Sequence, residues 1–118
     1  MENADIGRMG EEAAVRYLEE KGYRIERRNF RAERGEIDVI AWSSEGCLVF
    51  VEVKTRSLDG FGGPEAAVNR KKQDQMARTA GAFMESIGYE GEIRFDIISI
   101  ILQHGKLKSI RHMEDAFF

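Results

Sequence analysis

Two charged residues interrupt an otherwise apolar stretch of this 118-residue sequence. The run Val-Phe-Val-Glu-Val-Lys at positions 49–54 places Glu52 and Lys54 among residues typical of a buried strand. Side chains two positions apart on a strand share one face, about 6.5–7 Å apart along the backbone, so this carboxylate and this ammonium can converge on one point. Because an unpaired buried charge is costly, such groups are usually paired, neutralised or bound to a metal.

A second carboxylate could complete a metal site. Thirteen residues separate Asp38 from Glu52, and hairpin pairing of their segments could bring the two side chains together. Carboxylates hold a hard cation such as Mg²⁺ or Mn²⁺ through oxygen, and a lysine can orient or deprotonate a water or neutralise charge on a phosphate. A structural salt bridge of Lys54 with either acid is the competing interpretation. The third charged group favours a metal site made of Asp38, Glu52 and the Val53 carbonyl, with Lys54 beside the water.

Basic residues are clustered although the formal net charge is −3. Five arginines lie within residues 24–34, and a shorter basic run occupies positions 70–72. Such clusters can bind phosphates even in an acidic protein, although a solvated charged face is an equally good interpretation. Arg56 continues the strand face of the Glu-Val-Lys motif, whereas Lys72 belongs to the surface unless its helix flanks the site. The candidate nucleic-acid contacts are Arg28, Arg31, Arg34, Arg56 and Lys72.

The other polar and aromatic residues give weaker signals. Alternation over 36–42 predicts that Glu36, Asp38, Ile40 and Trp42 share one face. Glu36 could therefore be an additional acid, or it could end its strand in solvent. Roles without chemistry are expected for the remaining candidates: a structural aspartate (Asp96), two surface histidines (His104 and His112) and two packed aromatics (Trp42 and Phe61).

The elements that must position these residues follow from hydrophobic periodicity. Segments 36–42 and 48–54 alternate across a turn at 43–46, so we expect a hairpin, and 48–54 is apolar on both faces, as in a covered sheet. The full expectation is a helix over about 6–21, a strand from Tyr23 that fades near Arg28, this hairpin, a glycine-rich loop over 57–63, a helix over about 64–87, a strand over 93–102, a short strand near 107–110 and a last helical turn around 114–117. The order is αβββαβ plus a tail. The second helix is then a crossover suited to parallel pairing of 48–54 with 93–102.

Composition places the chain among ordinary soluble domains. Its length suits a single domain over residues 1–118, with 42% hydrophobic and 33% charged residues. No apolar run is long enough to span a membrane, and no signal peptide is visible, so we expect no membrane association. A lone Cys47 with two histidines excludes an internal disulfide and disfavours a zinc cluster. A reducing, cytoplasmic compartment is the expected location.

The spacing of Asp38, thirteen residues and then Glu52-Val53-Lys54 resembles the PD-(D/E)XK signature of restriction-endonuclease-like nucleases. More narrowly, the whole chain resembles the YraN-like family of small bacterial proteins, nearly end to end. The residues that carry this resemblance are Gly7–Glu11, Gly22-Tyr23, Arg28–Arg31, Gly35–Ala41, Val49–Arg56, Lys72, Arg94–Asp96 and Ala116-Phe117. The resemblance implies an α/β fold with a restriction-endonuclease-like αβββαβ core, in which helices flank a mixed central sheet. One departure is Ile37, which stands where the signature has proline.

The resemblance also implies similarity to archaeal Holliday-junction resolvases. In those enzymes a glutamate of the first helix joins the metal site, and Glu11 matches it here, although Glu12 is an equally plausible neighbour. The implied activity is Mg²⁺-dependent (or Mn²⁺-dependent) endonuclease cleavage of DNA, on branched or repair intermediates, with Glu11, Asp38, Glu52 and Lys54 catalytic. The alternatives are a non-catalytic nucleic-acid-binding module and a protein-interaction subunit. A junction-cutting version would be a two-fold symmetric homodimer, whose interface the sequence does not identify.

Overall fold

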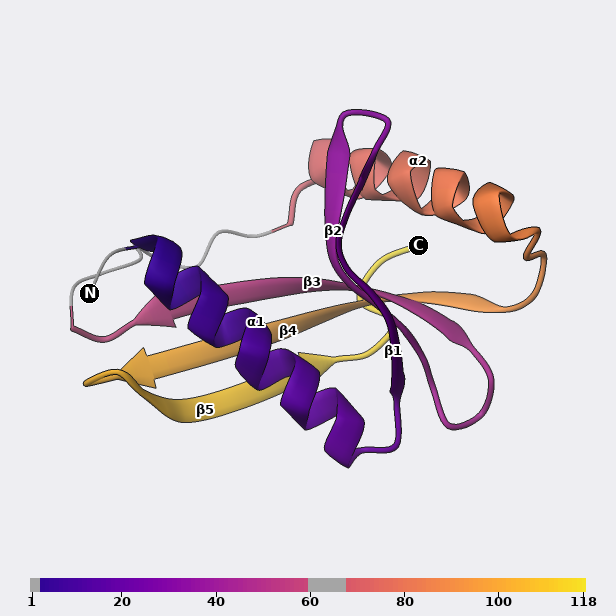
Figure 1. Cartoon of the computed structure of the whole chain (residues 1–118). Coiled ribbons are helices and arrows are strands. Elements are labelled where there is room, and N and C mark those ends of the chain that lie inside the picture. The colour runs from indigo at the N-terminus through magenta and orange to yellow at the C-terminus, as the bar shows by residue number, and fades with distance from the viewer. Residues whose placement is uncertain (1–2, 60–67) are drawn as a thin grey trace.

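In the part of the chain that the structure describes, seven elements build one sheet with a helix on each face (Figure 1). The computed structural model describes residues 3–59 and 68–118. The elements are α1 (Asn3–Glu20), β1 (Arg24–Ala32), β2 (Gly35–Trp42), β3 (Leu48–Ser57), α2 (Arg70–Ile87), β4 (Ile93–Gln103) and β5 (Lys106–Met113). The αβββαβ order is the predicted one, and β5 is the strand predicted in the tail. None of the helices in these ranges is long and apolar enough to cross a membrane.

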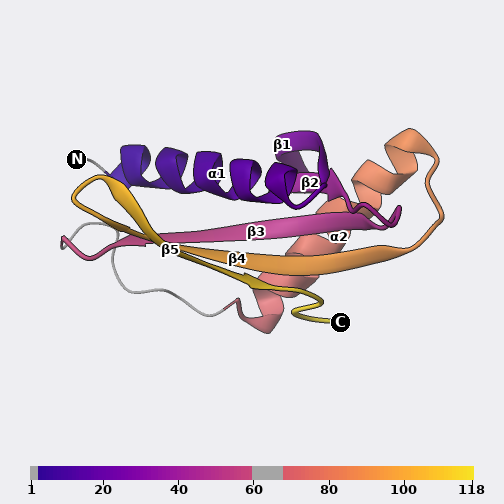
Figure 2. The same ribbon diagram turned by 90° about the horizontal axis from the view of Figure 1, so that it is seen from below.

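The five strands lie in their chain order, β1-β2-β3-β4-β5. Neighbours are antiparallel except β3 and β4, which are parallel from Leu48↔Ile93 to Ser57↔Leu102. A parallel pair needs a crossover, and α2 supplies it. Figure 2 shows α1 on one face of the sheet and α2 on the other. This arrangement confirms the restriction-endonuclease-like core and the predicted mixed sheet.

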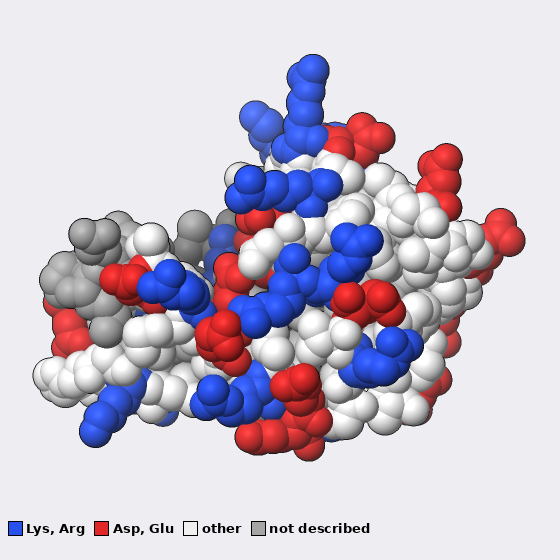
Figure 3. Space-filling model, viewed as in Figure 1, with Lys and Arg blue, Asp and Glu red and all other residues white. Residues whose placement is uncertain are grey.

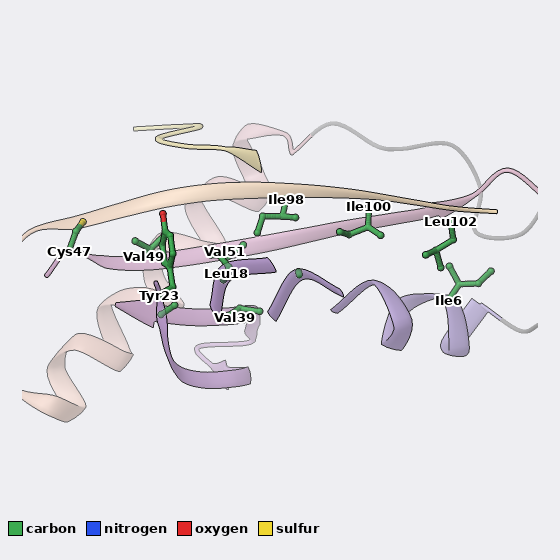
Figure 4. Packing of buried hydrophobic residues seen from close by; sticks show 12 residues of the cluster. Ile6, Leu18, Tyr23, Val39, Cys47, Val49, Val51, Ile98, Ile100 and Leu102 are labelled. Atoms are coloured by element: carbon green, nitrogen blue, oxygen red, sulfur yellow. The ribbon is translucent and has the colours of Figure 1, made fainter. Parts of the chain in front are cut away.

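Each helix covers a separate hydrophobic core. On the α1 side, Val49 and Val51 pack with Leu18 of the helix and with residues of β4 (Figure 4). On the α2 side, Leu48 and Phe50 pack with residues of the second helix. Because successive side chains of β3 alternate between these cores, the strand is apolar on both faces, as predicted.

The second helix starts later than predicted. The side chain of Asn69 accepts a hydrogen bond of 2.9 Å from the backbone N–H of Lys72, so Asn69 is the N-cap and the helix begins at Arg70. Val68 and Asn69 are not helical, so the predicted helix start near residue 64 is wrong at these two described residues. Pro64, Phe61 and most of the glycine-rich loop lie outside the described residues. The cap places Lys72 in the first turn of α2.

Strand β1 is longer than predicted and forms a hairpin with β2 that was not predicted from the sequence. The two strands pair out to Ala32↔Gly35, and the two connecting residues, Glu33 and Arg34, have φ values of 51° and 62°. These are the left-handed values of a type I′ turn, which sequences usually signal with Asn-Gly. Glu-Arg carries no such signal, so β1 was expected to fade early. The hairpin end packs on α2, where Thr79 Oγ1 donates 2.9 Å to the Ala32 carbonyl.

The tail is not helical. Residues 114–115 form a turn and residues 116–118 have no regular structure, so the predicted last helical turn is wrong. The tail is held to the sheet instead, because the Ala116 N–H donates 2.7 Å to the Phe95 carbonyl. The ring of Phe117 stacks on Phe95 with centroids 5.4 Å apart. An apolar end that looks like a helical stripe therefore closes the α2-side core in extended form.

Candidate metal and nucleic-acid site

The candidate site lies where β2 and β3 stop pairing. The last recorded pair joins Val39 to Val51, and the next pair in this register would join Asp38 to Glu52. Instead, the backbone N–H of Val53 donates 2.7 Å to Asp38 Oδ2. The carboxylate thus replaces a strand carbonyl as acceptor, and the two acids lie side by side at the end of the ladder.

A twist in the hairpin accompanies this separation. Ile37 packs in the α2-side core, whereas Val39, two residues on, packs in the α1-side core. A flat strand would place both on one face, so β2 twists at Asp38. Opposite Asp38 on β1, Asn29 has a φ of 53° and interrupts the ladder between Arg28 and Phe30. The prediction that residues 36–42 alternate regularly is therefore wrong at Asp38, and Figure 1 shows the hairpin rising from the sheet toward α2.

Glu52 lies between two lysines. Only 7% of its surface is exposed, and Lys54 Nζ and Lys72 Nζ lie 4.0 and 3.9 Å from its Oε1 and Oε2. Both contacts are too long for hydrogen bonds, and Oε2 is buried without a hydrogen-bond partner. Helix α2 therefore flanks the site, and Lys72 is part of the site rather than of a distant surface.

Burial disfavours the ionised forms of both site carboxylates. Burial raises the pKa of Asp38 to about 7, and the negative charge of Glu52 adds to the rise, against the hydrogen bond from Val53. Burial also raises the pKa of Glu52, although Lys72 and Lys54 oppose it. Such a pair favours any added cation, because a cation would stabilise the ionised form of both acids.

Helix α1 brings one glutamate to the same place. A Cβ on Gly10 would lie 1.8 Å from Thr55 Oγ1, so only glycine lets the helix approach β3 this closely. The next residue, Glu11, has a pKa raised by burial, opposed by a hydrogen bond with Asn29 and increased by the charge of Glu36. Glu12 instead accepts 3.0 Å from Arg28 and is exposed. The structure thus distinguishes Glu11 from Glu12, which the sequence left as equally plausible neighbours of the site.

The additional acid and the arginines surround the site. Glu36 accepts 2.9 Å from Arg31 Nε across the hairpin, and its charge contributes to the raised pKa of Asp38 and Glu52. A hollow of about 750 Å³ beside α1 is lined by Arg28 and Arg31, among others, and one of about 550 Å³ beside α2 by Arg31, Arg34 and Lys72. Figure 3 shows basic side chains over the hairpin with acidic ones among them.

Arg56 also carries an unsatisfied group. Its Nε is buried and has no hydrogen-bond partner. The residue follows Glu52 and Lys54 at strand spacing on β3. It is therefore placed as predicted, on the same strand beyond the site, with a donor left for an anionic group.

A second polar cluster joins β4, β5 and the tail, and the sequence did not reveal it. The carboxylate of Asp96 is fully buried. It accepts bonds of 2.8 Å from Arg94 Nε and Nη2, 2.7 Å from His112 Nε2 and 3.0 Å from the Asp115 N–H. Only 3% of the His112 side chain is exposed, so its predicted surface position is wrong. The imidazole lies instead between Asp96 and helix α1, with the Tyr17 ring 5.5 Å away.

This cluster resembles a metal site in spacing but not in charge. Among the residues that the structure describes, Asp96, His112 and Glu114 offer three ligand atoms within 4.8 Å of one another. However, the Arg94 guanidinium occupies both Asp96 oxygens and also contacts Glu114 at 3.3 Å. Burial alone would raise the pKa of Asp96, but hydrogen bonds from His112, Arg94 and the Asp115 backbone lower it below its usual value. The charge is already balanced, and a cation would meet the guanidinium.

Comparison with known proteins gives one consistent result. The model of the uncharacterised protein family UPF0102 matches residues 10–100. A UPF0102 protein of Alkaliphilus oremlandii is 48% identical over 118 residues, covering 98% of this chain and 99% of the relative. Others from Bacteroides thetaiotaomicron and Trichlorobacter lovleyi are 44% and 42% identical, and cover 99% and 98% of this chain and 95% and 91% of their own lengths. Their names state no activity.

Proposed function

The chain belongs to the uncharacterised protein family UPF0102, the YraN family that it resembles in sequence, and we propose that it is a Mg²⁺- or Mn²⁺-dependent nuclease. The proposed reaction is hydrolysis of phosphodiester bonds in DNA, including branched or repair intermediates. One observation carries the proposal. Glu52, with a buried oxygen that lacks a hydrogen-bond partner, lies beside Asp38 where β2 and β3 separate. A purely structural acid would be expected to have that oxygen satisfied.

The residues at this point fit a divalent cation. Asp38 and Glu52 would hold it with the Val53 carbonyl, and Glu11 on α1, whose charge raises the pKa of both acids, would join them. Burial is the largest cause of the raised pKa of all three acids, and a bound cation would favour their ionised forms. When bound, such a cation polarises a phosphate and lowers the pKa of a coordinated water.

Two lysines have complementary roles in this proposal. Lys54 and Lys72 are on β3 and α2, so they approach Glu52 from two elements. Lys54 is placed to orient a water or to neutralise charge that develops on a phosphate. Lys72 holds the other side of Glu52 and is available to a phosphate from the hollow that it lines with Arg31 and Arg34.

The decisive experiment compares cleavage by wild type, Lys54→Ala and Lys71→Ala. The substrates are linear, flapped, single-stranded and four-way-junction DNA, plus RNA, in Mg²⁺ and in Mn²⁺. We expect Lys54→Ala to lose at least about 100-fold in cleavage rate with nearly unchanged DNA binding. Lys71→Ala, an exposed lysine one residue from Lys72, is the matched control and should cut normally. Wild type that cuts none of these substrates, or Lys54→Ala that cuts as well as wild type, would refute the proposal.

The arginines of the hairpin are tested by binding. Arg31→Ala or Arg34→Ala should weaken DNA binding and reduce the slope of log affinity against log salt by about 1, since each removes one phosphate contact. Arg78→Ala, on the exposed face of α2, is the control. Binding without cleavage would support a nucleic-acid-binding module instead. Absence of both would leave a protein-interaction subunit as the better explanation.

A further inference from the structure

The outer face of α1 has a charge pattern that is complementary to itself. Arg8, Glu12, Arg16 and Glu20 recur every four residues and are all exposed. Rows of this spacing form a ridge on a helix surface. When two copies of the ridge run antiparallel about a point near residue 14, Arg8 faces the partner's Glu20, and Glu12 faces the partner's Arg16. Every facing pair then joins opposite charges. Figure 3 shows side chains of both signs along the face where Figure 1 draws this helix.

The four ridge residues do not pair with one another within the chain. Arg8 contacts Asp5, and Glu12 contacts Arg28. Among the described residues, Arg16 and Glu20 form no ion pair, and no ion pair joins neighbours along the ridge. Salt bridges four residues apart, the ordinary explanation for such an alternation, are therefore not formed.

An apolar groove adjoins the ridge. It lies between α1 and the β4–β5 edge, has a volume of about 440 Å³, and its apolar lining is Met9, Ala13, Tyr17, Leu102, Leu107 and Ile110. The three residues from α1 form the next row of the same helix. Leu107 is 50% exposed and lies on β5, an edge strand of the sheet. An apolar groove bordered by a charged row matches the anatomy of a protein interface, with an apolar centre and a polar rim.

We propose that α1 and this groove form the interface of a two-fold symmetric homodimer. The ridges of the two helices would lie parallel when the helix axes cross at about 50°, the commonest packing angle of helices. A two-fold axis requires each patch to be complementary to itself, and the Arg-Glu alternation meets that requirement. This face adjoins the candidate site, because Arg8 and Glu12 also line the hollow beside α1. The inference concerns the oligomeric state, so it stands whether or not the protein is a nuclease.

Charge exchange tests the proposal by sedimentation velocity and native mass spectrometry. One variant carries Arg8→Glu with Arg16→Glu, and the other carries Glu12→Arg with Glu20→Arg. Wild type should be a dimer. Each variant alone should dissociate at least about tenfold more readily, because every facing pair becomes a like-charge pair. An equimolar mixture should form the heterodimer, because its facing pairs are again opposite in charge.

Controls keep the outcomes distinct. Arg24→Glu with Arg78→Glu makes the same charge change at exposed arginines off the ridge and should leave the dimer intact. Leu107→Ser tests the groove without altering charge and should also weaken the dimer. It keeps the proposal testable if the charge variants fail to fold. A wild type that stays monomeric at all soluble concentrations would overturn the proposal. Variants that dimerise like wild type, or a mixture that gives no heterodimer, would overturn it equally.

Discussion

Asp38 and Asp96 show two ways in which one sheet accommodates an aspartate that water reaches poorly. Asp96 receives hydrogen bonds on both oxygens from Arg94, His112 and the Asp115 backbone, and its pKa is lowered. Asp38 receives a single backbone bond, lies beside the acid Glu52, and has a pKa raised to about 7. The first carboxylate is complete within the chain, whereas the second lacks positive charge. The first carboxylate therefore has a structural explanation, whereas the second is the one to which the proposed function assigns a cation.

The difference also extends to what surrounds each acid. Around Asp96, elements distant in sequence converge to donate, so the cluster ties β4 and β5 to the tail. At Asp38 the strands separate and the hairpin twists away, and a hollow beside α1 is lined by charged groups that include Glu11 and Glu36. Arg94 disfavours a cation at the first cluster, whereas the proposed function places a cation between Asp38 and Glu52 at the second.

The largest expected effect in this comparison is on stability at Asp96. Asp96→Asn should lower the free energy of unfolding by roughly 3–5 kcal/mol at pH 7, because a partly buried guanidinium loses its charged partner. Urea denaturation measures it. Asp74→Asn removes an exposed ion pair with Arg70 and should cost less than about 1 kcal/mol. Equal losses for the two variants would show that the Asp96 cluster contributes no more than a surface pair.

At Asp38 the expected effect is smaller and opposite in sign. Its folded pKa of about 7 lies above the unfolded value, so its contribution to stability is full below about pH 4 and is lost as pH rises through about 7. In EDTA at pH 8, Asp38→Asn should therefore be more stable than wild type by roughly 1–3 kcal/mol. The difference should vanish near pH 3.5, where the aspartate is protonated in both states. An Asp38→Asn variant that is less stable than wild type at pH 8 would contradict the raised pKa of Asp38.

The smallest expected effect is that of the cation. Binding should be weak, because few carboxylates are available and Mg²⁺ keeps several of its waters. At tenfold excess over the dissociation constant, Mn²⁺ should stabilise wild type by about 1.4 kcal/mol, a shift of several degrees in Tm. Calorimetry should show this binding lost in Asp38→Ala and retained in His112→Ala. The reverse result would place the cation at the Asp96 cluster.

The sequence by itself determined which face of β3 carries chemistry. Strand periodicity is local, so Glu52 and Lys54 had to share a side in any sheet that buries Val49 and Val51. It determined the order of elements for the same reason, and the crossover helix then required β3 and β4 to be parallel. The errors in the predicted element boundaries also have local causes. Asn69 is a readable helix cap, but a proline upstream suggested an earlier start, and the Glu-Arg turn carries no hairpin signal.

Only the tertiary structure decided which residues from other elements meet these two. Lys72 reaches Glu52 because the N-cap begins α2 beside the end of the β2–β3 ladder. Glu11, rather than Glu12, turns to the site because Gly10 lets α1 lie against Thr55. His112 is buried because Tyr17 of α1 and Asp96 of β4 contact it, which no pattern within β5 records. Periodicity fixes the direction of a side chain relative to its own backbone, whereas its neighbours and its pKa depend on contacts between segments that are distant in sequence.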